Sequence, residues 1–438
     1  MKYALVNPCW SFTHSTYFGC PDPHLPLEFL FARQQLQSAG HEVLLVDAHL
    51  ETLVATAAAR RIAAFAPDFL VLTTAPTYLF WRCPQPELTV PAYWMQTLRA
   101  ALPGTVTTVA AGPHASATPR ATGNKLGCDV VLRGECDVTL AQLASQPWED
   151  IAGCCWRDPT GWRLDPRQAQ VAMADLDALD FRDYPLHLRR HRHHVFSGAG
   201  RGAELEFSRG CPWNCTFCNK TLFRNKFRER AVDAVLSEAE TLVRHGVNYI
   251  YFIDEIFGAG KHTAALLEGL ATLPVTFGMQ TRIDLWDEDS LAALGRAHCI
   301  SLECGIESIT PEGRERYRKG CRLPNATLEH LLRTARAHVP WVQANLIAAD
   351  PDQQDADTAA IARWRQGLID AGVWVSQPVP VFAFPGSPLY AQKFGVPDDT
   401  AWERAHAHYL AANAQRSYSD IQDADPLPLV QLEYKNRE

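Results

Sequence analysis

Two periods of apolar residues alternate along the first 140 residues. Apolar runs of strand length occur at 2–7, 42–47, 69–73, 105–110 and 130–132. Between them apolar residues return at helical spacing, at 27–39, 53–65 and 93–102, and Gly40 follows the first of these segments as a helix-ending residue. Alternating strands and helices predict an α/β domain with a doubly wound, Rossmann-like parallel sheet.

The same alternation returns in the second half of the chain. Strands are predicted at 204–208, 247–253, 275–279, 300–305, 341–348 and 374–382, with helical segments between them, the clearest at 231–246. Six parallel strands with helices outside predict a partial (β/α)6 barrel. In barrels of this type, catalytic residues lie at the carboxyl ends of the strands.

The pattern weakens between these two regions, which places the domain boundary there. Residues 158–161 form a turn signal that could join two short strands, and 176–185 reads as an extended linker. We therefore expect four parts: the first domain at 1–145, a connector at 146–200, the barrel at 201–395, and a C-terminal helix and tail at 396–438.

Composition narrows the class of partner and the compartment. The chain has 438 residues, 47% of them hydrophobic, and a net charge of −8, so neither nucleic acid nor a membrane surface is an expected partner. We find no apolar segment of membrane-spanning length and no signal sequence. The 13 cysteines without a secretion signal argue against a disulfide framework and for a cytoplasmic, reducing location.

Three cysteines lie close together in a loop after the strand at 204–208. Cys211, Cys215 and Cys218 follow a C-x-x-x-C-x-x-C spacing. A cubane iron–sulfur cluster takes one thiolate per iron, so three thiolates leave one iron open to another ligand. The alternatives are a structural zinc site, for which no fourth Cys or His follows closely, and a chance cluster of buried cysteines.

This loop resembles the signature of the radical S-adenosylmethionine (SAM) superfamily. The resemblance implies a [4Fe–4S] cluster held by Cys211, Cys215 and Cys218, with SAM on the open iron and with Phe217 and Asn219 beside the cofactors. It also implies an electron donor such as flavodoxin or ferredoxin, and a 5′-deoxyadenosyl radical that abstracts hydrogen from a small-molecule substrate.

Charged residues follow several of the predicted barrel strands. By the same resemblance, Asp254 and the candidate catalytic residue Glu255 are expected near the SAM amino group, and Arg282 and Glu307 near its carboxylate, its ribose or the substrate. Carboxylates suit an ammonium, and a guanidinium suits a carboxylate. The alternative for each is a solvated charge at a strand end.

The first domain resembles the cobalamin (B12)-binding domain fused to many radical SAM enzymes. Its first turn, at 7–12, lacks the G-x-G-x-x-G glycines of a dinucleotide site. The resemblance rests on segments at 25–28, 39–43, 66–68, 111–115 and 132–135. Residues 22–27 lack the glycine of the D-x-H-x-x-G corrinoid motif, and Ala111-Gly112 replaces its glycine pair. Cobalamin binding and a scaffold without cofactor therefore both stay open.

A long first loop at 9–26 supplies candidate substrate ligands. Tyr17, Asp22 and His24 lie in it, and Gln377 lies in the last predicted barrel strand. The loop resembles that of a subgroup of the superfamily associated with carbohydrate and aminoglycoside tailoring. We therefore expect radical dehydration or deoxygenation of a sugar, with cobalamin-dependent C-methylation as the alternative. A non-catalytic electron carrier would need fully ligated clusters and no SAM site.

Overall fold

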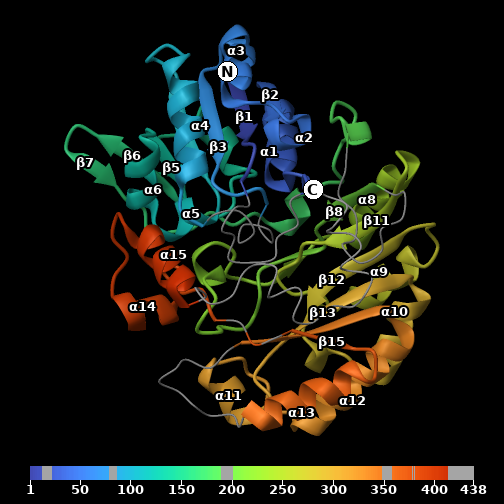
Figure 1. Ribbon diagram of the computed structural model, residues 1–438. Helices are drawn as coiled ribbons and strands as arrows, with labels where there is room; N and C mark the ends of the chain where they lie inside the picture. Colours follow the sequence, from blue (N-terminus) through green and yellow to red (C-terminus); the bar gives the residue numbers. More distant parts are fainter. Residues whose placement is uncertain are drawn as a thin grey trace. The chain divides into compact units, whose positions relative to one another are not determined.

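The computed structural model describes residues 1–11, 22–77, 86–188, 201–347, 358–376, 378 and 380–412. The chain forms two compact units, each built on its own sheet (Figure 1). The first unit comprises Met1–Arg189, Asn219–Asn225 and Ala383–His408, and the second comprises Arg190–Cys218, Lys226–Phe382 and Tyr409–Glu438. The expected connector at 146–200 is thus divided between the units after Arg189, and two short segments from later in the chain group with the first unit.

The first unit contains the predicted doubly wound sheet. The order of its strands is β2-β1-β3-β4-β5-β6-β7, in which β1 to β5 are parallel and β6 and β7 antiparallel. The strands are β1 (Lys2–Asn7), β2 (Glu42–Asp47), β3 (Phe69–Thr73), β4 (Thr107–Ala111), β5 (Val130–Leu132), β6 (Cys154–Asp158) and β7 (Gly161–Arg163). The turn signal at 158–161 indeed joins two short strands.

Helices cover this sheet on both faces. They are α1 (Leu27–Ser38), α2 (Ala48–Glu51), α3 (Ala55–Phe65), α4 (Thr89–Ala100), α5 (Pro113–Ala117), α6 (Pro119–Leu126) and α7 (Thr139–Gln142). Alternate residues of β1 enter different cores: Ala4 and Val6 pack in one apolar cluster and Tyr3 and Leu5 in the other. Because both faces are buried, the strands read as continuous apolar runs.

The end of β5 ties this sheet to the segment that follows it. Gly134 forms a parallel bridge with Ala169, and the Glu135 carboxylate accepts a 2.7 Å hydrogen bond from the Val171 backbone N–H. Gly134 has φ +84°, and a Cβ on it would overlap the backbone carbonyl oxygen of Ala169. A side chain at position 134 therefore meets both backbone strain and backbone atoms that cannot move aside.

The second unit contains a six-stranded sheet of order β15-β14-β13-β12-β11-β8, all parallel. Its strands are β8 (Arg201–Leu205), β11 (Val247–Phe252), β12 (Thr276–Thr281), β13 (Cys299–Glu307), β14 (Trp341–Leu346) and β15 (Trp374–Val375), and a separate pair joins β9 (Ser208–Arg209) to β10 (Arg228–Glu229). The partial barrel is thus confirmed, although β15 is much shorter than predicted.

Helices follow the strands of this sheet along the chain. They are α8 (Val232–Arg244), α9 (Thr263–Leu270), α10 (Glu288–Arg296), α11 (Pro311–Arg316), α12 (Asn325–His338) and α13 (Thr358–Ile369). The C-terminal α14 (Pro388–Phe394) and most of α15 (Ala401–Ala412) group with the first unit. None of the helices described has both the length and the apolar character needed to cross a membrane.

We predict that Gly134→Ala destabilises the first unit more than Gly40→Ala does. Both glycines have positive φ, +84° and +81°, but a Cβ on Gly40 would meet nothing within 4 Å. The control should cost about 1 kcal/mol of unfolding free energy from strain alone, and the overlap with Ala169 should raise the cost of Gly134→Ala to roughly 2–4 kcal/mol. Urea unfolding measures both, and equal losses would contradict the role of the overlap.

Candidate active site

The three-cysteine loop follows the short strand β9 and packs on the segment after α11. Cys211, Cys215 and Cys218 are all half-buried. The Thr216 backbone N–H donates a 2.9 Å hydrogen bond to the Tyr317 carbonyl, and the rings of Phe217 and Tyr317 meet edge to face with centroids 5.7 Å apart. The loop therefore has a fixed support within its own unit.

Gly210 makes the turn into the loop. It has φ +80°, a conformation that glycine adopts without strain, and its N–H donates a 2.7 Å hydrogen bond to the Glu255 carboxylate. The residue before Cys211 is thus held both by its own conformation and by a side chain from the end of β11.

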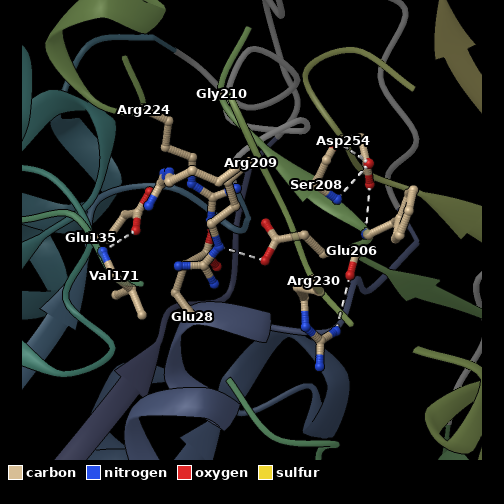
Figure 2. Close-up of polar contacts among 12 residues, drawn as sticks. Glu28, Glu135, Val171, Glu206, Ser208, Arg209, Gly210, Arg224, Arg230 and Asp254 are labelled. Carbon is tan, nitrogen blue, oxygen red and sulfur yellow. Dashed lines mark hydrogen bonds and ion pairs between the residues drawn. The ribbon is translucent and has the colours of Figure 1, made fainter. Parts of the chain in front are cut away.

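Asp254 holds the residues just before Gly210. Its carboxylate accepts hydrogen bonds from the Phe207 N–H at 2.9 Å and the Ser208 N–H at 2.7 Å, and a further one from the Ser208 hydroxyl (Figure 2). The side chain is fully buried. Burial raises the pKa of Asp254 to about 8, and the hydrogen bonds from Ser208 and Phe207 oppose this rise.

Two buried ion pairs surround the same stretch. Arg209 donates to Glu206 at 2.7 Å with both side chains fully buried, and Arg230 makes a two-pronged pair with Glu238 of α8 at 2.6 and 2.9 Å. Arg230 also donates to the Glu206 carbonyl at 3.0 Å (Figure 2). The sequence analysis missed these residues, although arginines and glutamates within apolar surroundings were a visible signal. Losing one partner would leave a buried charge without compensation.

Arg282, at the end of β12, contacts the loop through its guanidinium plane. Its guanidinium carbon lies 4.1 Å from the ring centroid of Trp213, which stands between Cys211 and Cys215. Its nitrogens pair with Asp284 at 2.6 and 3.0 Å. The guanidinium thus supports the loop as a cation over an aromatic face, a contact that the sequence analysis did not anticipate.

Glu307, at the end of β13, is paired with a buried lysine. Its carboxylate accepts a 3.0 Å hydrogen bond from the ammonium of Lys319, whose side chain is 5% exposed. Glu307 has φ +66°, an uncommon conformation for a residue with a side chain, and the ladder to β14 shifts register beside it. Such strain is concentrated at functional sites and needs support from the surrounding structure.

Charged and ionisable groups near Cys215 influence the pKa of its thiol. Burial raises the pKa of its thiol to about 12; the Lys319 ammonium opposes this rise, and Cys218, Glu307 and Cys211 add to it. A bound metal deprotonates such a thiol outright. In the parts of the chain that the structure describes, no three His, Cys, Asp or Glu side chains converge on a single ion. A cubane cluster does not require such convergence on one ion, because each thiolate binds a different iron.

The structure thus gathers most of the expected residues of the second unit around one loop. Glu255, Arg282 and Glu307 each contact the loop or its immediate supports, whereas Asp254 holds the backbone before it. Asn219 begins a segment that groups with the first unit. In that unit Asp22 is half-buried and His24 is 1% exposed, while Tyr17 and Gln377 lie outside the described residues.

Comparison with known proteins identifies the domain that contains this loop. Residues 205–349 match the family model of the radical SAM superfamily. The chain carries a radical SAM domain. The cofactors of this superfamily are a [4Fe–4S] cluster and SAM, and the three half-buried thiols on one supported loop fit the cluster.

Proteins similar to this chain include several named for methyl transfer. An uncharacterized methyltransferase of Pyrococcus horikoshii is 25% identical over 84% of this chain and 78% of its own length. Bacteriochlorophyllide d C-12(1)-methyltransferase of Chlorobaculum tepidum is 29% identical, and hopanoid C-3 methylase of Methylococcus capsulatus is 27% identical. The matches cover 42% and 37% of this chain and only 41% and 32% of those two proteins.

Two solved structures have a similar fold. The radical SAM methyltransferase TsrM of Kitasatospora setae, solved with cobalamin and a [4Fe–4S] cluster, has a TM-score of 0.69 at 17% identity over 89% of this chain and 76% of its own. The cobalamin-dependent radical SAM enzyme OxsB, solved with aqua-cobalamin, has a TM-score of 0.69 at 16% identity over 94% of this chain and 67% of its own. The likeness shows the fold: a B12-domain-like first unit and a radical SAM barrel.

We predict that Asp254→Asn destabilises the second unit by about 1–3 kcal/mol, because the amide would turn a donor toward a buried backbone N–H. Wild-type Asp254 holds its proton up to about pH 8 in the folded state and loses it near 3.8 when unfolded, so its contribution to stability falls as pH rises between those values. Asparagine has no such dependence, and the difference between the two proteins should therefore shrink from pH 5 to pH 8.

Thermal unfolding at both pH values measures this effect. Asp289→Asn, the same change at an exposed position in the first turn of α10, is the control and should stay within about 0.5 kcal/mol of wild type. A penalty that grows toward pH 8 would contradict the account of the Asp254 contacts.

Proposed function

We propose that this protein is a cobalamin-dependent radical SAM methyltransferase that transfers a methyl group from SAM to a carbon atom of a small molecule. The observation that carries the proposal is the 25% identity, over 84% of this chain and 78% of its own length, to a protein named as an uncharacterized methyltransferase. The likeness in fold to two enzymes solved with cobalamin supports it. The sugar deoxygenation expected from the first loop has no comparable support, since all three curated relatives named above carry methyl-transfer names.

The first unit offers features that suit a corrinoid. The Thr74 hydroxyl, just after β3, is buried without a hydrogen-bond partner in the described structure. Gly112, just after β4, has φ +119°, and a Cβ there would lie 2.6 Å from the Thr74 hydroxyl oxygen. Ligands of doubly wound sheets bind beyond the carboxyl ends of the strands, where both residues lie. Thr74 is therefore the residue that we assign to cobalamin first.

In the second unit the protein's part is to hold and orient. When bound, the cluster supplies the electron that cleaves SAM and cobalamin supplies the methyl group. Cys211, Cys215 and Cys218 hold the cluster as thiolates, and Glu255 fixes the turn before Cys211 through Gly210. Glu307, brought into an uncommon backbone conformation beside Lys319, is the carboxylate that we assign to SAM.

The roles expected for Arg282 and for an electron carrier remain predictions under this proposal. Arg282 pairs with Asp284 and lies over Trp213, so we assign it to positioning the loop before any contact with SAM. An electron carrier such as flavodoxin or ferredoxin would reduce the cluster, and the cytoplasmic location remains an expectation.

Removal of any one loop cysteine should abolish cluster binding. We predict that Cys211→Ala, Cys215→Ala and Cys218→Ala each lose most of the iron and sulfide after anaerobic reconstitution, against about four iron atoms per wild-type chain. Cys9→Ala, which removes a half-buried thiol of the first unit, is the matched control and should load normally. If any of the three variants retained the wild-type iron content, the cluster would have to be bound by other ligands.

The products formed from SAM distinguish methyl transfer from deoxygenation. We predict that the wild-type protein, reconstituted anaerobically with iron, sulfide and hydroxocobalamin, retains near-stoichiometric cobalt after removal of the excess. Under strong reduction it should form S-adenosylhomocysteine, which SAM leaves after losing its methyl group, together with 5′-deoxyadenosine. Mass spectrometry and cobalt analysis measure these products. If the protein has an intact cluster and forms 5′-deoxyadenosine but retains no cobalt and forms no S-adenosylhomocysteine, the methyltransferase proposal fails. That result would favour a deoxygenase whose first unit is a scaffold without cobalamin.

A further inference from the structure

Polar side chains gather on one face of the six-stranded sheet of the second unit. The strand registers place Gln280 of β12 beside Glu303 of β13, and Glu303 beside Gln343 of β14. Side chains alternate between the two faces of a strand, so these three share a face. Their neighbours Met279, Leu302 and Val342 occupy the opposite, apolar face. We call the residues Tyr251, Gln280, Ser301, Glu303, Gln343 and Asn345 the polar face.

Hydrogen bonds link the members of the polar face. Gln280 donates to the Glu303 carboxylate at 3.3 Å, and the Tyr251 phenol also hydrogen-bonds to it. Gln343 donates to the Asn345 side-chain oxygen at 2.7 Å. Polar groups from four strands thus converge in neighbouring register positions, which orients the carboxylate of Glu303.

The charge of Glu303 has no counter-ion in the described structure. Among the described residues no Lys, Arg or His pairs with Glu303, and no inward position of the described strands of this sheet carries Lys or Arg. Burial raises the pKa of Glu303 to about 7, against the opposing hydrogen bonds from Gln280 and Tyr251. An enclosed carboxylate without a cation is costly to ionise, and a ligand that brings a positive charge removes that cost.

Two further observations point to a ligand at this place. Glu303, Gln280 and Asn345 are half-buried, so solvent still reaches them. The Ser301 hydroxyl, one inward position before Glu303 on β13, is fully buried and has no hydrogen-bond partner in the described structure. Buried polar groups normally have partners, so an unpartnered hydroxyl on the same strand face as the Glu303 carboxylate favours a polar ligand at this place.

An aromatic pair borders the polar face. The rings of Trp341 and Trp374 stack with centroids 6.1 Å apart, and Trp374 lies beside Gln343 in the register of β14 and β15. Trp374 is half-buried. The flat face of an indole attracts cations and covers the apolar side of a ring. The surroundings of Glu303 therefore suit a cationic group carried on a small molecule.

We propose that Glu303 binds a positively charged amino group of the substrate, with Gln280, Gln343 and Asn345 binding its neighbouring polar groups. This inference rests on the proposed function and narrows its substrate to an amine-bearing small molecule, in contrast to a lipid or a neutral pigment. A carboxylate that accepts hydrogen bonds from an ammonium makes the strong, charge-assisted kind. Glu303 is therefore a specificity-determining residue, and a neutral analogue with hydroxyl in place of the amine is bound more weakly.

The test compares amine and hydroxyl analogues of equal shape on the reconstituted protein saturated with SAM. The probes are glucosamine against glucose and tyramine against tyrosol, and binding is followed by ligand-observed NMR titration. We expect at least one amine to bind about tenfold or more tightly than its hydroxyl partner, and Glu303→Gln to remove that difference. Glu268→Gln, the same change at an exposed position of α9, should retain it.

Charge reversal supplies a result that a purely structural role of Glu303 would not produce. Glu303→Lys should invert the preference, so that glucuronate binds more tightly than glucosamine. The inference is overturned if neither amine is preferred by the wild type, or if the preference survives in Glu303→Gln. It is also overturned if Glu303→Gln weakens SAM binding and SAM displaces the amines, because Glu303 would then hold the amino group of SAM.

A separate measurement keeps this inference apart from the proposed function. S-adenosylhomocysteine formation by the wild type, without any probe, tests the methyltransferase alone. If that product forms and no amine is preferred, the substrate assignment fails and the methyltransferase stands. If the amines are preferred and neither S-adenosylhomocysteine nor 5′-deoxyadenosine forms, the binding site stands and the methyltransferase fails.

Discussion

Asp254 and Glu255, which follow β11, fix the backbone before the cysteine loop through hydrogen bonds, and the candidate active site depends on this constraint. A loop that presents three thiols to one cluster must keep its entry fixed, yet it has no regular structure of its own between Gly210 and Cys218. Asp254 and Glu255 supply the missing partners, because together they accept the N–H groups of Phe207, Ser208 and Gly210. The two side chains therefore act on the cysteine loop through the backbone.

The remaining supports come from successive strand ends of the same sheet. Arg282 from β12 covers Trp213 in the loop, and Glu307 from β13 binds Lys319, whose charge reaches Cys215. Because parallel strands bring their carboxyl ends to one edge, residues far apart in the chain act on one short loop. The buried ion pairs of Arg209 with Glu206 and of Arg230 with Glu238 add to the support of the backbone before the loop.

The polar face of the same sheet separates two tasks within one barrel. The strand ends carry the residues assigned to the cluster and SAM, whereas Glu303, Gln280 and Gln343 lie further back along their strands. A substrate group held there is fixed by rigid strands and not by loops, which favours precise positioning.

The sequence alone determined the architecture and the three thiols, because both are local in the chain. Strand and helix periods identify the doubly wound sheet and the partial barrel, and the C-x-x-x-C-x-x-C spacing lies within one loop. It also placed Glu255, Arg282 and Glu307 at strand ends. Only the tertiary structure decided what these side chains contact, since hydrogen bonds and ion pairs such as Asp254 to Ser208 or Lys319 to Glu307 depend on which strand ends meet. The polar face was invisible for the same reason: Gln280, Glu303 and Gln343 become neighbours only through strand register, which no local pattern specifies.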